Sequence, residues 1–339
     1  MNNRWFDNLV RFAPQLITLA VILFLSSLVF DDFFKIEIAN GRIYGSLIDI
    51  LNRGAPVALL AIGMTLVIAT KGIDLSVGAV MAISGAVAAA TVDGGGHVLL
   101  ALTLALSVGI LCGLWNGLLV SVLDIQPIIT TLILMVAGRG IAQLITGGTI
   151  LTFTDPGLIF IGSGSVLSVP TPILIWLAVS LCTLWIVRGT ALGMLIESIG
   201  INRRASMLSG INTRVLLISV YLVSGLCAAL AGTIAAADIK GADANNAGLW
   251  LELDAILAVV IGGTSLLGGR FTLVGSLLGA MIIQSVNTGI LLSGYPPEFN
   301  LIIKAAIIVA ILVIQSPAIQ SQFTAFQKGA LAKTIGKAL

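Results

Sequence analysis

The sequence predicts an all-α polytopic membrane protein with about ten transmembrane helices, and composition, glycine content and hydropathy lead to this prediction. Of its 339 residues, 58% are hydrophobic and 9% are charged, with a mean hydropathy of +1.12. Soluble domains usually carry about 25% charged residues. The 38 glycines suit transmembrane helices, whose backbones approach closely where small residues meet. This composition excludes a soluble enzyme, a nucleic-acid-binding protein and a disordered chain.

The apolar residues form runs that we interpret as membrane spans. The first run, Phe12–Phe30, is followed by two aspartates and not by a small-residue cleavage site, so we expect a retained span and not a secretory signal. The further runs are Ala55–Thr70, Val77–Thr91, Val98–Val122, Ile128–Ile145, Thr171–Val187, Val215–Ala235, Ala255–Leu266, Phe271–Leu292 and Asn300–Ile314.

Two of these runs, Ala55–Thr70 and Ala255–Leu266, are short for a hydrocarbon core of about 30 Å. A glycine-containing break follows each of them, at Lys71–Gly78 and at Gly262–Arg270. Non-helical backbone at membrane depth is tolerated only within protein or beside a water-filled cavity. We therefore predict broken helices that border a transport pathway.

The basic residues predict the orientation. With the N-terminus in the cytoplasm, most Lys and Arg residues fall in cytoplasmic segments, and only Lys35, Arg42, Arg53 and Lys240 fall outside. This bias satisfies the positive-inside rule. Both termini are therefore predicted to be cytoplasmic, and Arg139 and Lys304 lie within spans.

One predicted cytoplasmic segment, residues 188–214, is much longer than a turn. Met194–Ile199 and Ala205–Leu208 could form two short helices, with Asn202 as the N-cap of the second. Gly210 and Asn212 lie where a helix end needs a left-handed residue. The segment is either a basic loop that sets topology and touches lipid, or a docking element for a soluble partner.

Polar residues at or near span ends are candidates for lining the transport pathway. They are Asp74, Ser76, Asn116, Gln126, Thr130, Arg139, Gln143, Gln284 and Asn287. Each could instead be satisfied by a neighbouring helix, and Asp74 could serve as a structural partner or N-cap for the span that begins at Val77. Arg139 is the strongest candidate, because a cation within a span needs a carboxylate, a carbonyl or water.

No catalytic or metal site is expected. The single histidine cannot build a histidine-based metal site, and no phosphate-binding G-x-x-x-x-G-K-[ST] loop occurs. We therefore expect that the chain is not an enzyme and carries no cofactor.

Three motifs carry a family resemblance. They are G-I-D-L-S-V-G at Gly72–Gly78, G-I-N-R-R-A-S-M-L-S-G-I-N at Gly200–Asn212, and E-L-D-A-I-L-A-V-V-I-G-G-T-S-L-L-G-G at Glu252–Gly269. In this order they resemble permease subunits of ribose-type sugar ABC importers, in the branched-chain amino acid/ribose permease superfamily. The segments Ile48–Thr70 and Lys240–Asp254 look closest to a galactofuranose importer permease. The family-motif residues are Gly72, Asp74, Leu75, Gly78, Glu252, Asp254, Gly262 and Gly263.

The resemblance implies a type II ABC importer permease-like fold, with residues 1–339 as one permease domain and 188–214 as its ATPase-coupling loop. The residues matching the coupling motif are Gly200, Asn202, Arg203, Arg204, Met207, Leu208, Ser209, Gly210 and Asn212. The pair Arg203-Arg204 departs from the small or polar residues often found there.

The resemblance also implies partners in the bacterial cytoplasmic (inner) membrane. These are a second permease subunit, identical or related, an ATPase subunit whose two nucleotide-binding domains hold ATP and Mg, and a periplasmic sugar-binding protein. Membrane lipid surrounds the chain, and no nucleic acid is involved.

Two other classes of protein remain to be weighed. A stand-alone ion-coupled secondary sugar transporter would more often place a carboxylate deep within a span, whereas the acidic residues here fall at span ends or in loops. A prenyl-transferring membrane enzyme would need two facing acidic clusters, but the adjacent pair Asp31-Asp32 has no such counterpart.

Overall fold

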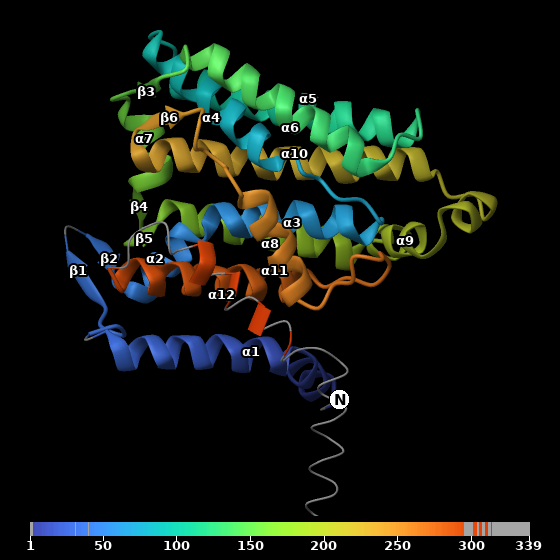
Figure 1. The fold of residues 1–339 in the computed structure, drawn as a ribbon, viewed down its shortest axis with the longest axis horizontal. Helices are drawn as coiled ribbons and strands as arrows, with labels where there is room; N and C mark the ends of the chain where they lie inside the picture. The colour runs from blue at the N-terminus through green and yellow to red at the C-terminus, as the bar shows by residue number, and fades with distance from the viewer. Residues whose placement is uncertain are drawn as a thin grey trace, which may run out of the picture.

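A computed structural model of the chain describes residues 3–30, 32–39, 41–294, 301–303, 305, 306, 309, 310 and 313. Within these residues the protein is a bundle of helices, most of which run along one common direction, from left to right in Figure 1. Three two-stranded antiparallel sheets pair β1 with β2, β3 with β6, and β4 with β5. The all-α prediction is confirmed, and the predicted span Asn300–Ile314 lies, apart from isolated residues, outside the described residues.

The elements follow one another along the chain with short connections. The helices are α1 (Asn3–Val29), α2 (Ser46–Arg53), α3 (Ala55–Ala69), α4 (Val77–Asp93), α5 (Val98–Ser121), α6 (Pro127–Thr146), α7 (Pro156–Ser163), α8 (Thr171–Gly189), α9 (Leu192–Leu208), α10 (Thr213–Ile239), α11 (Leu251–Ile261) and α12 (Leu273–Leu292). The strands are β1 (Glu37–Ala39), β2 (Arg42–Tyr44), β3 (Ile150–Thr152), β4 (Ser165–Val166), β5 (Val169–Pro170) and β6 (Gly241–Asp243). Proline occupies the first turn of α3, α6, α7 and α8, where its missing N–H costs no hydrogen bond.

The number of membrane-crossing helices is lower than the predicted ten. In the described residues, 6 helices are long and apolar enough to cross a membrane, or 7 if α2 and α3, which bend by 44° at Gly54, count as one span. Helix α4 has 17 residues and α11 has 11, so neither reaches across a bilayer alone. The prediction counted them as full spans because hydropathy detects an apolar run but does not show whether the helix begins at the membrane surface or inside the bundle.

Helix α10 lies at the centre of the bundle and packs against α3, α4 and α5 (Figure 1). Small residues make this packing possible. A Cβ atom at Gly109 or Gly113 of α5 would collide with the α10 backbone at Gly225 and Tyr221. The four-residue glycine spacing of α5 thus lets two helix backbones approach closely, as in other membrane bundles.

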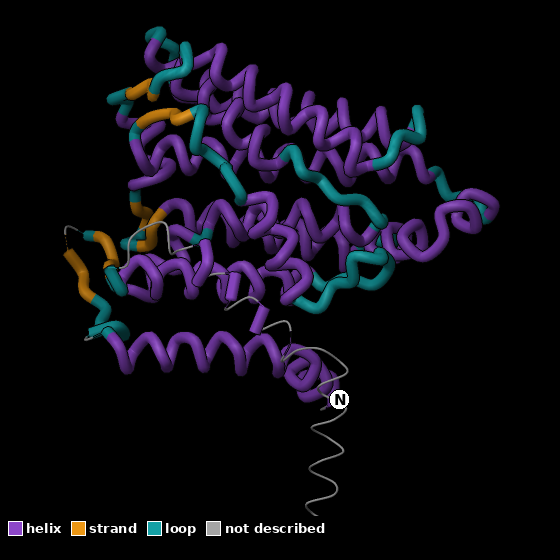
Figure 2. Tube along the Cα trace, in the orientation of Figure 1, coloured by secondary structure: helices purple, strands orange, loops and turns teal. Residues whose placement is uncertain are grey.

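The connections gather at two opposite ends of the bundle. Figure 2 shows all the strands at one end, which we call the hairpin end, and α9 at the other, which we call the α9 end. The connection between α11 and α12 also lies at the α9 end, where the Gly269 amide donates a 2.9 Å hydrogen bond to the Ala69 carbonyl. The segments predicted to be extracytoplasmic and cytoplasmic are thus separated in space (Figure 1).

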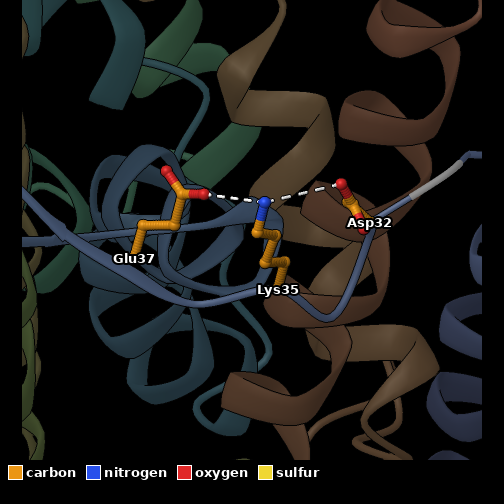
Figure 3. Close-up of polar contacts among 3 residues, drawn as sticks. All are labelled: Asp32, Lys35 and Glu37. Atoms are coloured by element: carbon orange, nitrogen blue, oxygen red, sulfur yellow. Dashed lines mark ion pairs between the residues drawn. The ribbon is translucent and has the colours of Figure 1, made fainter.

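An exposed group of charges precedes β1 at the hairpin end. The Lys35 Nζ atom lies 2.9 Å from Glu37 and 3.7 Å from Asp32 (Figure 3). The hydrogen bond to Glu37 and the charge of this carboxylate raise the pKa of Lys35. Because more than half of each side chain is exposed, these pairs add little to stability.

Candidate functional site

The first interruption of the bundle is the segment Lys71–Ser76, between α3 and α4. It starts at the α9 end and runs back into the bundle, so that α4 begins inside the protein (Figure 1). Its Asp74 side chain is only 2% exposed. We call this segment the first break.

The Asp74 carboxylate lies in a network of hydroxyl and amide donors. Its Oδ1 atom accepts from the Ser76 amide at 3.1 Å and from the Ser76 hydroxyl at 2.6 Å. Its Oδ2 atom accepts from the Ser224 hydroxyl of α10 at 2.7 Å. The Asn116 amide of α5 donates to the Ser76 hydroxyl at 2.9 Å. Three path candidates, Asp74, Ser76 and Asn116, therefore come together and tie α4 to α5 and α10.

The second interruption is the segment Ala244–Trp250, between β6 and α11. It runs from the hairpin end to the middle of the bundle, where α11 begins (Figure 1). We call this segment the second break. Gly248 and Trp250 have left-handed backbone conformations, with φ of 71° and 66°. Asn245 and Asn246 are exposed, so this break has a polar open face.

Arg139 of α6 holds the second break through its backbone. One guanidinium nitrogen, Nη1, donates to the Ala244 carbonyl at 3.0 Å and to the Ala247 carbonyl at 2.6 Å. One turn further along α6, the Gln143 amide donates to the Asn245 side chain at 2.8 Å. The cation within the span thus finds carbonyl partners, one of the three solutions that the sequence analysis allowed.

The sequence analysis placed the second interruption elsewhere. It took Gly262–Arg270 as backbone at membrane depth, whereas this segment forms the connection of α11 to α12 at the α9 end, with Leu267 79% exposed. The prediction was wrong because the interruption precedes the short apolar run Ala255–Leu266, whereas the glycines that were taken to mark it follow the run. Gly262 serves close packing instead, since a Cβ there would collide with the Gly275 backbone of α12.

The two broken helices meet at their N-terminal ends. A Cβ atom at Gly78 of α4 would collide with the Gly248 carbonyl and lie 2.5 Å from a Glu252 carboxylate oxygen of α11. The Glu252 and Asp254 side chains are 8% and 4% exposed. The end of the first motif, at Gly78, is therefore a neighbour in space of the start of the third motif, at Glu252.

A cavity of about 570 Å³ opens at the α9 end. Its walls include Lys71, Gln126 and Tyr221, together with Arg203 and Arg204 of α9. Arg203 forms an ion pair with Asp124 at 3.0 Å. This pairing within the chain occupies one of the two arginines that the sequence analysis offered to a partner protein.

Helix α9 has the kinked shape expected for the coupling segment. Asn202 leaves the helical conformation, with φ of −156°, and its Oδ1 accepts from the Ala205 amide at 3.0 Å, which confirms the predicted N-cap. Gly210 is left-handed, with φ of +85°, also as predicted. Asn212 is not left-handed. Its side chain instead caps α10 by accepting from the Val215 amide at 3.3 Å.

At Gly200 the backbone of α9 packs directly against the bundle. A Cβ atom there would collide with the Ala69 carbonyl at the end of α3 and would lie 2.5 Å from the Gly269 amide. Glycine at this position therefore allows a close approach of the two backbones. Beyond the kink, Met207 and Leu208 are 52% and 84% exposed, and Ser209 is also exposed.

The remaining path candidates do not join one site. Thr130 is fully buried, Gln126 lines the cavity at the α9 end, and Asn287 is half-buried in α12. Gln284 lines a second cavity, of about 270 Å³, at the hairpin end.

Sequence reasoning missed Ser224, which contacts the first break, and Asn245, which belongs to the second. Ser224 is one small residue among many in α10, and only its distance from Asp74 distinguishes it.

Residues 46–312 match the family described as "Branched-chain amino acid transport system / permease component". The chain is 61% identical to the galactofuranose transporter permease protein YtfT of Escherichia coli, over 89% of each chain. It is 44% identical to the fructose import permease protein FruF of Bifidobacterium longum, over 83% of this chain and 80% of that one. It is 39% identical to the ribose import permease protein RbsC of Escherichia coli, over 89% and 92%. No solved structure matches the chain.

Proposed function

The chain belongs to the family of branched-chain amino acid transport system permease components, and from this membership we propose that it is the transmembrane permease subunit of an ABC importer for a monosaccharide. Galactofuranose is the favoured sugar, and a ribose-like sugar is the other choice. The observation that carries the proposal is the 61% identity to a galactofuranose transporter permease over 89% of both chains. The other relatives described above are also permeases for sugars.

The alternative, an ion-coupled secondary transporter, is weighed by family membership, because the positions of the buried carboxylates do not argue against it. The sequence analysis argued against it because no carboxylate lay deep in a span. Asp74 is in fact 2% exposed at the start of α4, so that argument fails. Family membership and the three sugar-permease relatives now favour the ABC importer.

The proposal includes partners, because the chain would supply only the path. A second permease subunit, an ATPase subunit with two nucleotide-binding domains, and a periplasmic sugar-binding protein complete the importer. ATP and Mg would bind the ATPase subunit. We further propose a bacterial inner-membrane location, with both termini and α9 in the cytoplasm and the hairpin end in the periplasm.

The decisive experiment is reconstitution of this chain with its native partners in proteoliposomes. Uptake of labelled D-galactose, D-ribose and D-fructose is measured with and without ATP, and with an imposed proton or sodium gradient. The proposal expects uptake that needs ATP and the sugar-binding protein, with galactose, which contains some furanose form, preferred. Uptake driven by an ion gradient without ATP would support the alternative.

Orientation is tested with two single cysteines in a variant that lacks Cys112, Cys182 and Cys227. Leu167, in the β4–β5 turn, is 94% exposed, and Leu208 of α9 is 84% exposed. A membrane-impermeant thiol reagent should label Leu167→Cys from the periplasm and should reach Leu208→Cys only after the membrane is opened. Labelling of Leu208→Cys in intact cells would reverse the proposed orientation.

The role of α9 is tested by Gly200→Val. Because the added methyl groups collide with the Ala69 carbonyl, α9 must move, and sugar uptake per ATP hydrolysed should fall. Gly41→Val in the β1–β2 turn is the matched control at the hairpin end, since no atom of the described residues lies within 4 Å of a Cβ there, although its φ of +74° costs some stability. If Gly200→Val takes up as much sugar per ATP hydrolysed as the wild type, the basic residues of α9 serve only to set the orientation of the chain in the membrane.

A further inference from the structure

The cavity at the hairpin end has a polar floor and a charged rim. Asn52 of α2 and Gln284 of α12 form the floor and are 9% and 8% exposed. Arg53 and Asp238, both exposed, form the rim. The cavity holds about 270 Å³, slightly less than the usual pocket for a drug-sized ligand. A ligand that fills it must be small.

The two floor carboxamides have hydrogen-bonding capacity to spare. The Asn52 Oδ1 atom is buried without a hydrogen-bond partner in the described part of the chain. The Gln284 Nε2 atom makes one long bond, 3.4 Å to the Thr288 hydroxyl. A carboxamide offers two donors and one acceptor oxygen, and a buried polar atom that lacks a partner costs free energy. Hydroxyl groups, which both donate and accept, match this floor.

The charges at this cavity balance. Arg53 and Asp238 carry opposite signs, and the next charges that act on Asp238, Arg42 and Asp49, are again one of each sign. The cavity at the α9 end differs, because Lys71, Arg203 and Arg204 face only Asp124 there. A neutral ligand therefore suits the hairpin end better than a sugar phosphate or a sugar acid.

We propose that this cavity is an outer subsite of the permease that holds one neutral monosaccharide, with Asn52 and Gln284 bonded to its hydroxyl groups. The inference rests on the proposed function, since it takes the hairpin end as the side from which sugar arrives. It adds a sugar contact within a single permease chain, formed by residues from α2, α10 and α12. Of the path candidates, Gln284 belongs to this subsite.

The test uses a cysteine as a reporter that leaves the polar groups intact. Ala235 lines the cavity and carries no hydrogen-bonding side chain. In the reconstituted complex without native cysteines, the rate at which a thiol reagent modifies Ala235→Cys is measured with added D-galactose, D-ribose or D-gluconate. A bound sugar should slow modification by 1 + [sugar]/Kd, about threefold at twice Kd. The neutral sugars should protect and gluconate should not.

Variants then assign the protection to the floor. Gln284→Leu and Asn52→Leu should each abolish protection in the Ala235→Cys background. Ser285→Ala is the matched control, because the Ser285 hydroxyl bonds to the Met281 carbonyl at 2.7 Å and lies outside the cavity lining. Leu167→Cys, exposed at the same end, should be modified at one rate with or without sugar. Gln284→Glu, which keeps the side-chain size, should also lose protection if Leu variants fail to assemble.

The outcomes separate this inference from the proposed function. If the complex imports sugar but no sugar protects Ala235→Cys, the cavity holds only water and the inference is overturned. Equal protection by gluconate would overturn the argument from charge balance, and with it the assignment of a neutral ligand. If the complex imports no sugar, the proposed function itself fails.

Discussion

The two breaks solve the same problem with opposite chemistry. The first break brings a carboxylate, Asp74, into the bundle and surrounds it with hydroxyl and amide donors. The second break presents two carbonyl groups, which accept hydrogen bonds from a single cation, Arg139. The first break is held mainly at its own side chain, Asp74, whereas the second is held mainly at its backbone carbonyls. Each satisfies polar groups that an unbroken helix would have paired internally.

The breaks also differ in what surrounds them. Asp74 and Ser76 are 2% and 1% exposed, so the polar network of the first break is enclosed by protein, although Lys71 at its start is exposed. Asn245 and Asn246 of the second break are exposed. We infer from this difference that the first break is a structural element within one chain. The exposed asparagines of the second break are instead free to contact a ligand or a partner protein. The predictions below test this distinction.

The contact between the breaks should be the most sensitive point. Gly78→Val forces a side chain against the Gly248 carbonyl and the Glu252 carboxylate, and neither α4 nor α11 can retreat without opening a break. We expect a loss of more than about 3 kcal/mol of stability, and little complex that elutes as a single species in size-exclusion chromatography. Gly140→Val on α6, where a Cβ has no neighbour within 4 Å in the described part of the chain, should assemble normally. Normal assembly of Gly78→Val would mean that the two helices are not in contact.

The first break should depend on its carboxylate. Asp74→Ala leaves the Ser76 and Ser224 hydroxyls without their acceptor, and we expect a loss of about 3 kcal/mol, seen as a lower thermal midpoint of the purified complex. Asp74→Asn keeps one acceptor oxygen and should lose less. If both variants melt like the wild type, the network does not hold α4 in place.

The sequence could predict the parts of this site that have a local signature. The glycine-flanked segment Gly72–Gly78, the cap at Asn202 and the left-handed Gly210 all follow from residue type and spacing. The position of the second break could not be predicted, because Asn245, Asn246 and Gly248 are equally typical of an ordinary solvent-exposed loop.

The hydrogen-bond partners on different helices could not be predicted from the sequence for a different reason. Ser224 lies 150 residues from Asp74 along the chain, and Ala244 lies 105 residues from Arg139. Such partners depend on the rotation of each helix about its axis, and α4, α5 and α10 are apolar on all sides, so no hydrophobic face fixes that rotation. The buried polar residues could be recognised, but their partners could not.

Loss of the Arg139 cation at the second break should reduce stability less than loss of Asp74 does at the first break, and its main effect should be on sugar transport. Arg139→Leu removes the donor of two carbonyls, which costs about 1–2 kcal/mol, so the complex should still assemble. Sugar uptake should fall because the open segment loses its shape. Arg139→Lys, which keeps the charge but not the planar guanidinium group, should recover part of the uptake. Wild-type uptake by Arg139→Leu would remove Arg139 from the path.

The smallest effect concerns the one non-glycine residue that each break holds in a left-handed conformation. Lys71 in the first break has φ of 63°, and Trp250 in the second has φ of 66°. Glycine adopts this conformation without steric cost but loses more entropy on folding, so the two terms nearly offset each other.

Lys71 is exposed and makes one long hydrogen bond, 3.3 Å to the Ile201 carbonyl, so Lys71→Gly should raise the stability by about 0.5 kcal/mol. Trp250 is 53% exposed, and the packed half of its indole ring is lost in Trp250→Gly, which should therefore be destabilising. The thermal midpoints of the two variants, measured side by side in the same detergent, should move in opposite directions. A clear loss of stability in Lys71→Gly would show that the lysine side chain fixes α9 to the first break, and the closed break would then depend on α9 as well as on Asp74.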